Sequence, residues 1–174
     1  MRHLLILTLV APLVLSACKE DVADVPPPAE LSEETLSFFC QMNVAEHGGP
    51  KGQIHLAGYP QPLFFAQVRD MVAYLKSPER DAEITAVYVS DMAQANSWKN
   101  PGTGNWITAE AATFVIGAGV AGGMGAPEIV PFATEQGAAE FISRYGGEPV
   151  PLSAIPDEAA LAPVDLTQVL ETPA

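Results

Sequence analysis

The chain has 174 residues, of which 48% are hydrophobic and 17% are charged, so it is long enough for one or two small domains and too short for a large multidomain enzyme. Eight Lys and Arg residues stand against 21 Asp and Glu residues, which gives a formal net charge of −13. This acidity argues against nucleic-acid binding, and two cysteines are too few for a disulfide scaffold or a four-cysteine metal site.

The N-terminal segment has the proportions of a signal peptide. A short positive stretch precedes an apolar run over residues 4–15, which is too short to cross a bilayer comfortably. The run ends in Leu-Ser-Ala-Cys at 15–18, which resembles a bacterial lipobox, in which the cysteine is acylated and becomes the mature N-terminus. We therefore expect residues 1–17 to be removed and Cys18 to carry the lipid. The alternative is an ordinary secretory signal followed by a chance cysteine.

These signals predict a periplasmic protein that is attached to a membrane through its N-terminal lipid anchor. Lys19 follows the cysteine, at a position where Asp commonly marks retention in the inner membrane, so the outer membrane is favoured. Residues 18–31 are acidic and rich in proline and predict an extended tether that holds the domain away from the membrane. With Cys18 acylated, Cys40 is the only thiol left for chemistry.

A cluster of possible metal ligands follows the tether. Cys40, Met42 and His47 bring a thiol, a thioether and an imidazole into eight consecutive positions. In an extended segment, the side chains of Cys40 and Met42 would lie on the same side of the chain. Soft sulfur ligands select Cu(I), and imidazole also suits copper. The turn Gly48-Gly49-Pro50 would fold His47 back toward the thiol.

Each of these residues also has a purely structural interpretation. Cys40 would pack as a small hydrophobic residue beside two phenylalanines, Met42 would belong to the core, and His47 would lie on a surface loop. His55 is a weaker candidate, because it alternates with Ile54 and Leu56 in a predicted strand and would point away from the core.

The pattern then predicts two similar units. In the first unit, strands are expected at 53–57, 63–65 and 84–89, with a helix from Val68 to Leu75. A loop is expected over 90–105. In the second unit, strands are expected at 112–116 and 129–132, followed by a helix capped by Thr134. Phe65-Ala66 and Phe132-Ala133, 67 positions apart, stand at equivalent points. The predicted fold class is α+β, with two strand-strand-helix-strand units built on antiparallel sheets. We place the first unit at 32–104, the second at 105–155 and a C-terminal tail at 156–174.

Three further features lie outside the first cluster. Met124 stands in a glycine-rich stretch over 122–125, where close backbone approach would let its thioether reach a metal; a simple turn is the alternative. Met92 is another possible sulfur donor that more simply packs at a strand end, and Met71 has the spacing of a core residue. Two tryptophans at 98 and 106 bracket a loop, and at least one is expected to pack against its own domain.

Several segments together resemble the NosL family of lipoprotein copper chaperones. They are Cys40-Gln41-Met42, the run from His47 to Ile54, Val89-Ser90-Asp91, the two tryptophans, Gly123-Met124-Gly125, the run from Val130 to Ala133, and Gly146-Gly147. With the lipobox, the resemblance spans roughly residues 1–155. The family often has glycine between the cysteine and the methionine, where this chain has Gln41, which changes backbone freedom but not the donor set.

The resemblance implies a Cu(I) metallochaperone of the periplasm that delivers copper toward the CuZ centre of nitrous oxide reductase, in concert with an ABC-type membrane complex. It implies Cys40 and Met42 as ligands, with Met124 and His47 as candidates for the remaining positions. It also implies a fold related to organomercurial lyase, whose chemistry needs paired cysteines. Because only one remains here, we expect no enzymatic activity.

Two other functions remain open at this stage. The first is a metal-free lipoprotein that serves as a binding or scaffold module, with the tryptophan loop as its contact surface. The second is a thiol-dependent enzyme that uses Cys40 as the nucleophile and His47 as the base. The sequence assigns no third group to orient that histidine.

Overall fold

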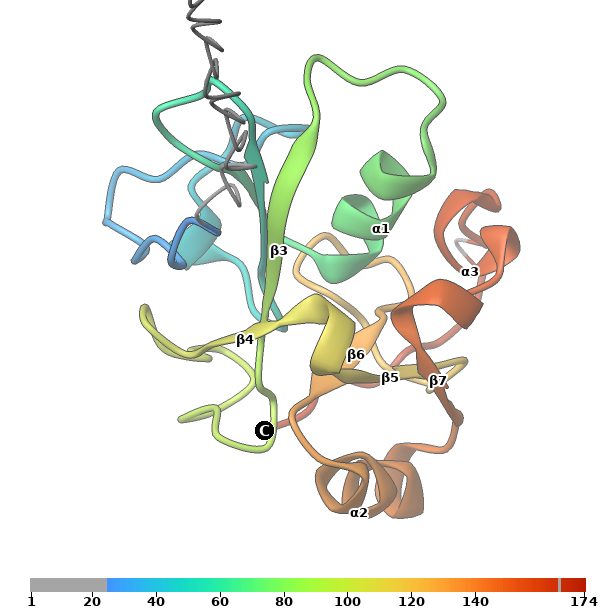
Figure 1. The fold of residues 1–174 in the computed structure, drawn as a ribbon. Coiled ribbons are helices and arrows are strands. Elements are labelled where there is room, and N and C mark those ends of the chain that lie inside the picture. Colours follow the sequence, from blue (N-terminus) through green and yellow to red (C-terminus); the bar gives the residue numbers. More distant parts are fainter. Residues whose placement is uncertain (1–24, 166) are drawn as a thin grey trace, which may run out of the picture.

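The computed structural model describes residues 25–165 and 167–174 (Figure 1). The expected signal peptide, residues 1–17, and the expected lipid-bearing Cys18 lie outside the described residues, so both stay predictions from the sequence. No helix in the described ranges is long and apolar enough to span a membrane.

The first unit is a four-stranded antiparallel sheet with one helix. Its elements are β1 (Gly52–Leu56), β2 (Leu63–Phe65), α1 (Val68–Lys76), β3 (Ile84–Ser90) and β4 (Trp106–Thr108). The strand order is β2-β1-β3-β4, so β1 pairs with β2 on one side and with β3 on the other. A short 3-10 helix, η1 (Val44–Glu46), precedes the sheet.

The second unit repeats this connectivity. Its elements are β5 (Thr113–Ile116), β6 (Val130–Phe132), α2 (Glu135–Tyr145) and β7 (Glu148–Pro151). The strand order is β6-β5-β7, so the strand after the helix again pairs with the first strand of the unit. Shorter helical turns are η2 (Ala109–Ala111), η3 (Leu152–Ala154) and α3 (Asp157–Leu161). The predicted α+β class with two similar units is confirmed.

The helices begin and end where the sequence signals them. Thr134 caps α2, because its Oγ1 accepts the N–H of Gly137 at 3.1 Å. Gly146, with φ of 73°, ends that helix in a conformation that favours glycine. Helix α1 buries Val68, Met71 and Val72 on one face. Figure 1 shows α1 beside β3 and α2 at the opposite end of the molecule.

The two units share one hydrophobic core. The largest cluster of buried side chains joins β1, α1 and β3 to β5, with Ile54, Met71, Val89 and Phe114 essentially inaccessible to solvent. A second cluster around Trp98 and Phe132 lies under α2, and the half-buried Phe141 and Tyr145 cover it. The units are therefore packed as one body, and a loop of one unit can be held by residues of the other.

Three regions differ from the sequence-based expectation. From Pro26 onward the tether lies on the first sheet: Tyr88 Oη donates to the carbonyl of Pro26 at 2.7 Å, and Ala29 exchanges two hydrogen bonds with the side chain of Gln53. Strand β4, which lies beyond the expected boundary at 104/105, pairs with β3 of the first sheet. The tail is not loose, because its last residues pair with the loop that carries Met124.

Candidate metal-binding site

Cys40 lies in a tight turn and not in an extended segment, so that part of the prediction is wrong. The main-chain N–H of Ser37 donates to the carbonyl of Met42 at 2.9 Å, and Gln41 N–H donates back to Ser37 at 2.9 Å. Gln41 has φ of 57°, the left-handed conformation that favours glycine. This turn presents the Cys40 and Met42 side chains from a closed loop whose geometry the main chain fixes.

Cys40 and Met42 are both partly exposed, although aromatic rings surround the base of the turn. Phe38 packs edge-on against Phe65 and Tyr74, which attaches the turn to β2 and α1. Cys40 is half-buried, and the side chain of Met42 is 40% exposed. The interpretations of Cys40 and Met42 as ordinary core residues therefore do not fit the structure, because neither side chain is enclosed.

The imidazole of His47 is oriented by the loop of the second unit. His47 Nδ1 lies 3.1 Å from the carbonyl oxygen of Gly123; since a carbonyl only accepts, this nitrogen carries the proton and donates. The other ring nitrogen, Nε2, is buried and has no hydrogen-bond partner among the described residues. Metal-binding histidines characteristically donate their second ring N–H in this way, so the hydrogen bonding of His47 is compatible with a ligand role.

Met124 stands at the tip of a short hairpin, residues 120–128, which we call the Met124 hairpin. Ala121 bridges Pro127, and the N–H of Gly122 donates to the carbonyl of Ala126 at 2.8 Å. The thioether side chain is 39% exposed. Gly123, the residue before Met124, contacts His47, so the hairpin of the second unit lies beside the loop that carries the histidine.

Glycines at the hairpin tip permit a very close approach. A Cβ added to Gly122 would lie 2.3 Å from a carboxylate oxygen of Glu128, and one added to Gly123 would lie 2.6 Å from the Cβ of His47. Such contacts do not occur between real atoms. A side chain at position 123 would therefore push the hairpin away from His47, and one at position 122 would displace the Glu128 carboxylate.

One polar network connects the hairpin, the histidine and the Cys40 turn. Gln67, which precedes α1, accepts the N–H of Met124 on its Oε1 at 3.0 Å. Its neighbour Ala66 donates its N–H to Ser37 Oγ in the Cys40 turn at 3.3 Å. Buried Lys51 donates from Nζ to the carbonyls of Ala66 and His47. All four candidate ligands are thus attached to the junction between β2 and α1.

Two buried ionisable groups lie beneath this junction. Burial lowers the pKa of Lys51 to about 8, opposed by the nearby Glu128, and burial raises the pKa of Glu128 to about 8. Glu128 Oε1 accepts the N–H groups of Arg69 and Ile129, whereas its Oε2 has no partner within the described ranges. Lys51 belongs to the first unit and Glu128 to the second, so both units contribute an ionisable group to the buried interior beneath the site.

Gln67, Lys51 and Glu128 were not identified from the sequence as parts of the site. Lys51 appeared only within the run from His47 to Ile54, and nothing in the sequence distinguishes a buried lysine from a solvated one. Gln67 and Glu128 are 61 positions apart and meet only because the two units pack together. The run of glycines marks the tip of the hairpin in the sequence, but no pattern marks the polar residues Gln67 and Glu128 that contact it.

The weaker candidates lie apart from this network. His55 bonds to the Gln53 side chain at 2.9 Å and packs edge-on against Tyr88 on the first sheet. Met92 is half-buried against the second cluster, and Met71 is fully buried, as the sequence suggested for both. Trp98 is buried and stacks on Phe141 of the second unit, so at least one tryptophan packs within the protein, as expected, although it does so across the two units.

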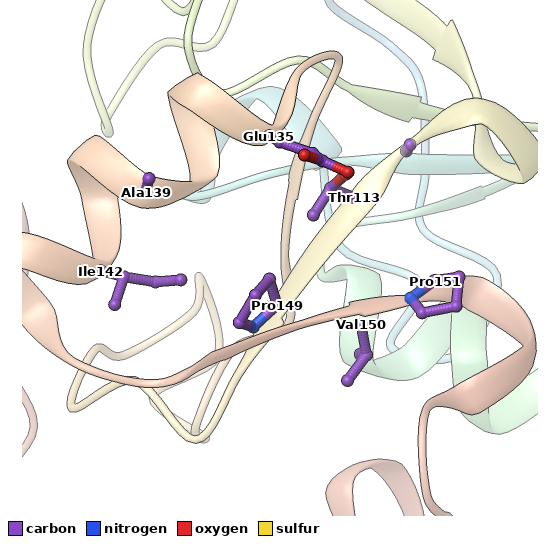
Figure 2. A pocket seen from close by; sticks show the side chains of 8 residues that line it. Thr113, Glu135, Ala139, Ile142, Pro149, Val150 and Pro151 are labelled. Atoms are coloured by element: carbon purple, nitrogen blue, oxygen red, sulfur yellow. The ribbon is translucent and has the colours of Figure 1, made fainter.

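A cavity of about 600 Å³ lies elsewhere, between α2 and the β5–β7 ladder. Figure 2 shows Ile142 and Pro149 on either side of it, with Glu135 and Thr113 at one end. None of the four candidate ligands lines this cavity. Within the part of the chain that the structure describes, no three His, Cys, Asp or Glu side chains converge as a metal site.

Comparisons with known proteins agree with this description. The family model described as NosL matches residues 28–160. The copper-binding lipoprotein NosL of Achromobacter cycloclastes is 51% identical over 153 residues, which are 87% of this chain and 79% of that protein. The copper-binding lipoprotein NosL of Stutzerimonas stutzeri is 31% identical over 150 residues, covering 84% and 76% of the two chains.

A solved structure is also similar. The crystal structure of the copper chaperone NosL from Shewanella denitrificans superposes with a TM-score of 0.69 at 30% identity, and the match covers 75% of this chain and 97% of that one. Fold and sequence together define a small α+β protein. Its relatives are named as copper-binding lipoproteins and as a copper chaperone. The chain belongs to the NosL family. The relatives' names describe metal binding and not an enzyme, in agreement with the expectation from the sequence.

Proposed function

We propose that this chain is a metallochaperone that binds Cu(I) through Cys40, Met42, Met124 and His47. The observation that carries the proposal is the state of His47, whose Nδ1 donates to the hairpin beside Met124 while Nε2 is buried without a hydrogen-bond partner. Thiolate and thioether sulfur with one imidazole is a soft donor set that favours Cu(I) over hard cations. The names of the relatives support copper as the cargo.

The exposure of Met42 and Met124 supports a role in the transfer of copper and not in its storage. Met42 and Met124 are exposed to solvent, whereas His47 is held by its hydrogen bond to Gly123. Ligands of a partner can therefore approach a bound ion from the side of the two methionines. Stepwise exchange of one ligand at a time lets a tightly held ion leave without being released into solution. The acidic surface favours docking onto a basic partner.

We further propose the destination and the compartment that the family resemblance implies. The cargo is delivered for assembly of the CuZ centre of nitrous oxide reductase, with an ABC-type membrane complex as a partner. The protein acts in the periplasm from a lipid anchor on Cys18, with the outer membrane favoured by Lys19. The names of the relatives as lipoproteins support the anchor.

The direct test is anaerobic competition for Cu(I) against a chromophoric chelator. We expect wild type to withdraw one equivalent of Cu(I) from the chelator and Cys40→Ala to withdraw almost none, because the thiolate is the one charged donor of the set. His55→Ala is the matched control, since His55 lies on the first sheet and bonds to Gln53. Equal affinity of wild type and Cys40→Ala would overturn the proposed site.

A further inference from the structure

Near the end of the chain, Glu171 forms an isolated parallel β-bridge with the base of the Met124 hairpin. Glu171 pairs in parallel with Val120: its N–H donates to the carbonyl of Gly119 at 2.8 Å, and its carbonyl accepts the N–H of Ala121 at 2.8 Å. Both bonds use only the main chain. They fix the base of the hairpin three to five positions before Met124.

The same segment also reaches the loop that carries His47. The carbonyl of Ala174 accepts the N–H of Trp98 at 3.3 Å, and the carbonyl of Trp98 accepts the N–H of Gly49 at 2.7 Å. The indole ring packs so closely on this turn that a Cβ on Gly49 would lie 3.3 Å from it. Gly49 is two positions after His47, so the end of the chain is connected through a single tryptophan to the turn that follows the histidine.

We propose that residues 170–174 are a strap that positions the Met124 hairpin relative to His47 and thereby sets the affinity of the copper site. This inference rests on the proposed function. Glu171, Thr172 and Ala174 are exposed, so the strap contributes little buried surface to the core. Its contribution is the hydrogen bonds that attach it to the Met124 hairpin and, through Trp98, to the turn after His47. The strap lies beyond residues 28–160, the part that the family model matches.

Because the strap acts through main-chain bonds, its side chains and its backbone are separable by mutation. Glu171→Pro removes the N–H that donates to Gly119, whereas Glu171→Ala removes the carboxylate and keeps both bonds. Deletion of residues 170–174 is the second test variant. Neither change touches a proposed ligand, and circular dichroism checks that the sheets remain folded.

We expect Glu171→Pro and the deletion to weaken Cu(I) binding by about 10- to 100-fold, the range for losing an outer contact that orients a ligand, while Glu171→Ala binds like wild type. Combining Glu171→Pro with Met124→Ala should cost no more than Met124→Ala alone, because both remove the same ligand. Unchanged affinity in Glu171→Pro, or full additivity with Met124→Ala, would overturn the strap.

A measurement without copper separates the strap from the proposed function. Amide hydrogen exchange of residues 122–125 in the apoprotein should accelerate in Glu171→Pro and in the deletion, but not in Glu171→Ala. If exchange is unchanged, the strap is wrong even when Cys40→Ala abolishes copper binding. If exchange accelerates but wild type binds no copper, the positioning role of the strap stands and the proposed function falls.

Discussion

At the scale of single residues, the backbone of Gln41 is the most unusual feature of the site. Its φ of 57° costs an L-residue about 1 kcal/mol relative to glycine, and its side chain donates to the carbonyl of Phe38 at 2.7 Å. The positive φ means that glycine would suit this position. Glutamine replaces the conformational freedom of glycine with a local hydrogen bond that holds the same turn.

Substitution of Gln41 should show these two effects separately. Gln41→Ala keeps the strained φ and loses the side-chain hydrogen bond, whereas Gln41→Gly loses the bond but relieves the strain. We expect Gln41→Ala to be less stable than Gln41→Gly by about 1 kcal/mol in urea unfolding. If the alanine variant is at least as stable as the glycine variant, the turn does not require a left-handed backbone conformation at position 41.

At the scale of elements, the strands and helices were largely predictable from the sequence, and the loops that form the site were not. Strand 63–65 and the start of α1 at Val68 match their apolar patterns, because burial of one face dictates the period. The turn at Cys40 was missed because Gln41 is not a residue that normally signals a positive φ. Contacts such as Gln67 with Met124 depend on how the two units pack, which local patterns do not encode.

The Met124 hairpin offers a test at this scale. Gly123→Ala would place a methyl group 2.6 Å from the Cβ of His47 and 2.7 Å from the carbonyl of Gly48, so the hairpin must move away. We expect Cu(I) affinity to fall by about 10- to 100-fold in the chelator competition while the fold remains intact. Gly125→Ala is the control, since a Cβ there meets no atom within 4 Å, although its φ of +80° adds some strain. Similar affinities in the two variants would show that the close approach of the hairpin is not needed.

At the scale of the whole molecule, the buried pair of Lys51 and Glu128 makes stability depend on pH. In the folded protein the pKa of Glu128 is about 8, against an ordinary value of 4.5. Between pH 4.5 and pH 8, the folded state therefore holds a proton that the unfolded chain has released. Because of this difference, the free energy of unfolding falls as pH rises through that range. The folded pKa of Lys51 is about 8, against 10.5, so above pH 8 the unfolded chain holds the extra proton and stability rises again.

These signs predict a stability minimum near pH 8 from this pair. Glu128→Gln keeps an oxygen to accept the N–H groups of Arg69 and Ile129 but cannot ionise. Between about pH 5 and pH 8 we expect wild type to lose on the order of 2–4 kcal/mol more than this variant in urea unfolding. Parallel stability curves for the two proteins would mean that the Glu128 carboxyl is not held protonated by burial.

The donor set of the copper-loaded protein tests the central claim most directly, and X-ray absorption at the copper edge measures it. For anaerobically loaded wild type we predict sulfur scattering from Cys40, Met42 and Met124 together with one imidazole, and loss of one sulfur in each of Met42→Leu and Met124→Leu. The imidazole signal should disappear in His47→Asn and persist in His55→Asn. Spectra that keep every sulfur and nitrogen donor in all of these variants would contradict the account.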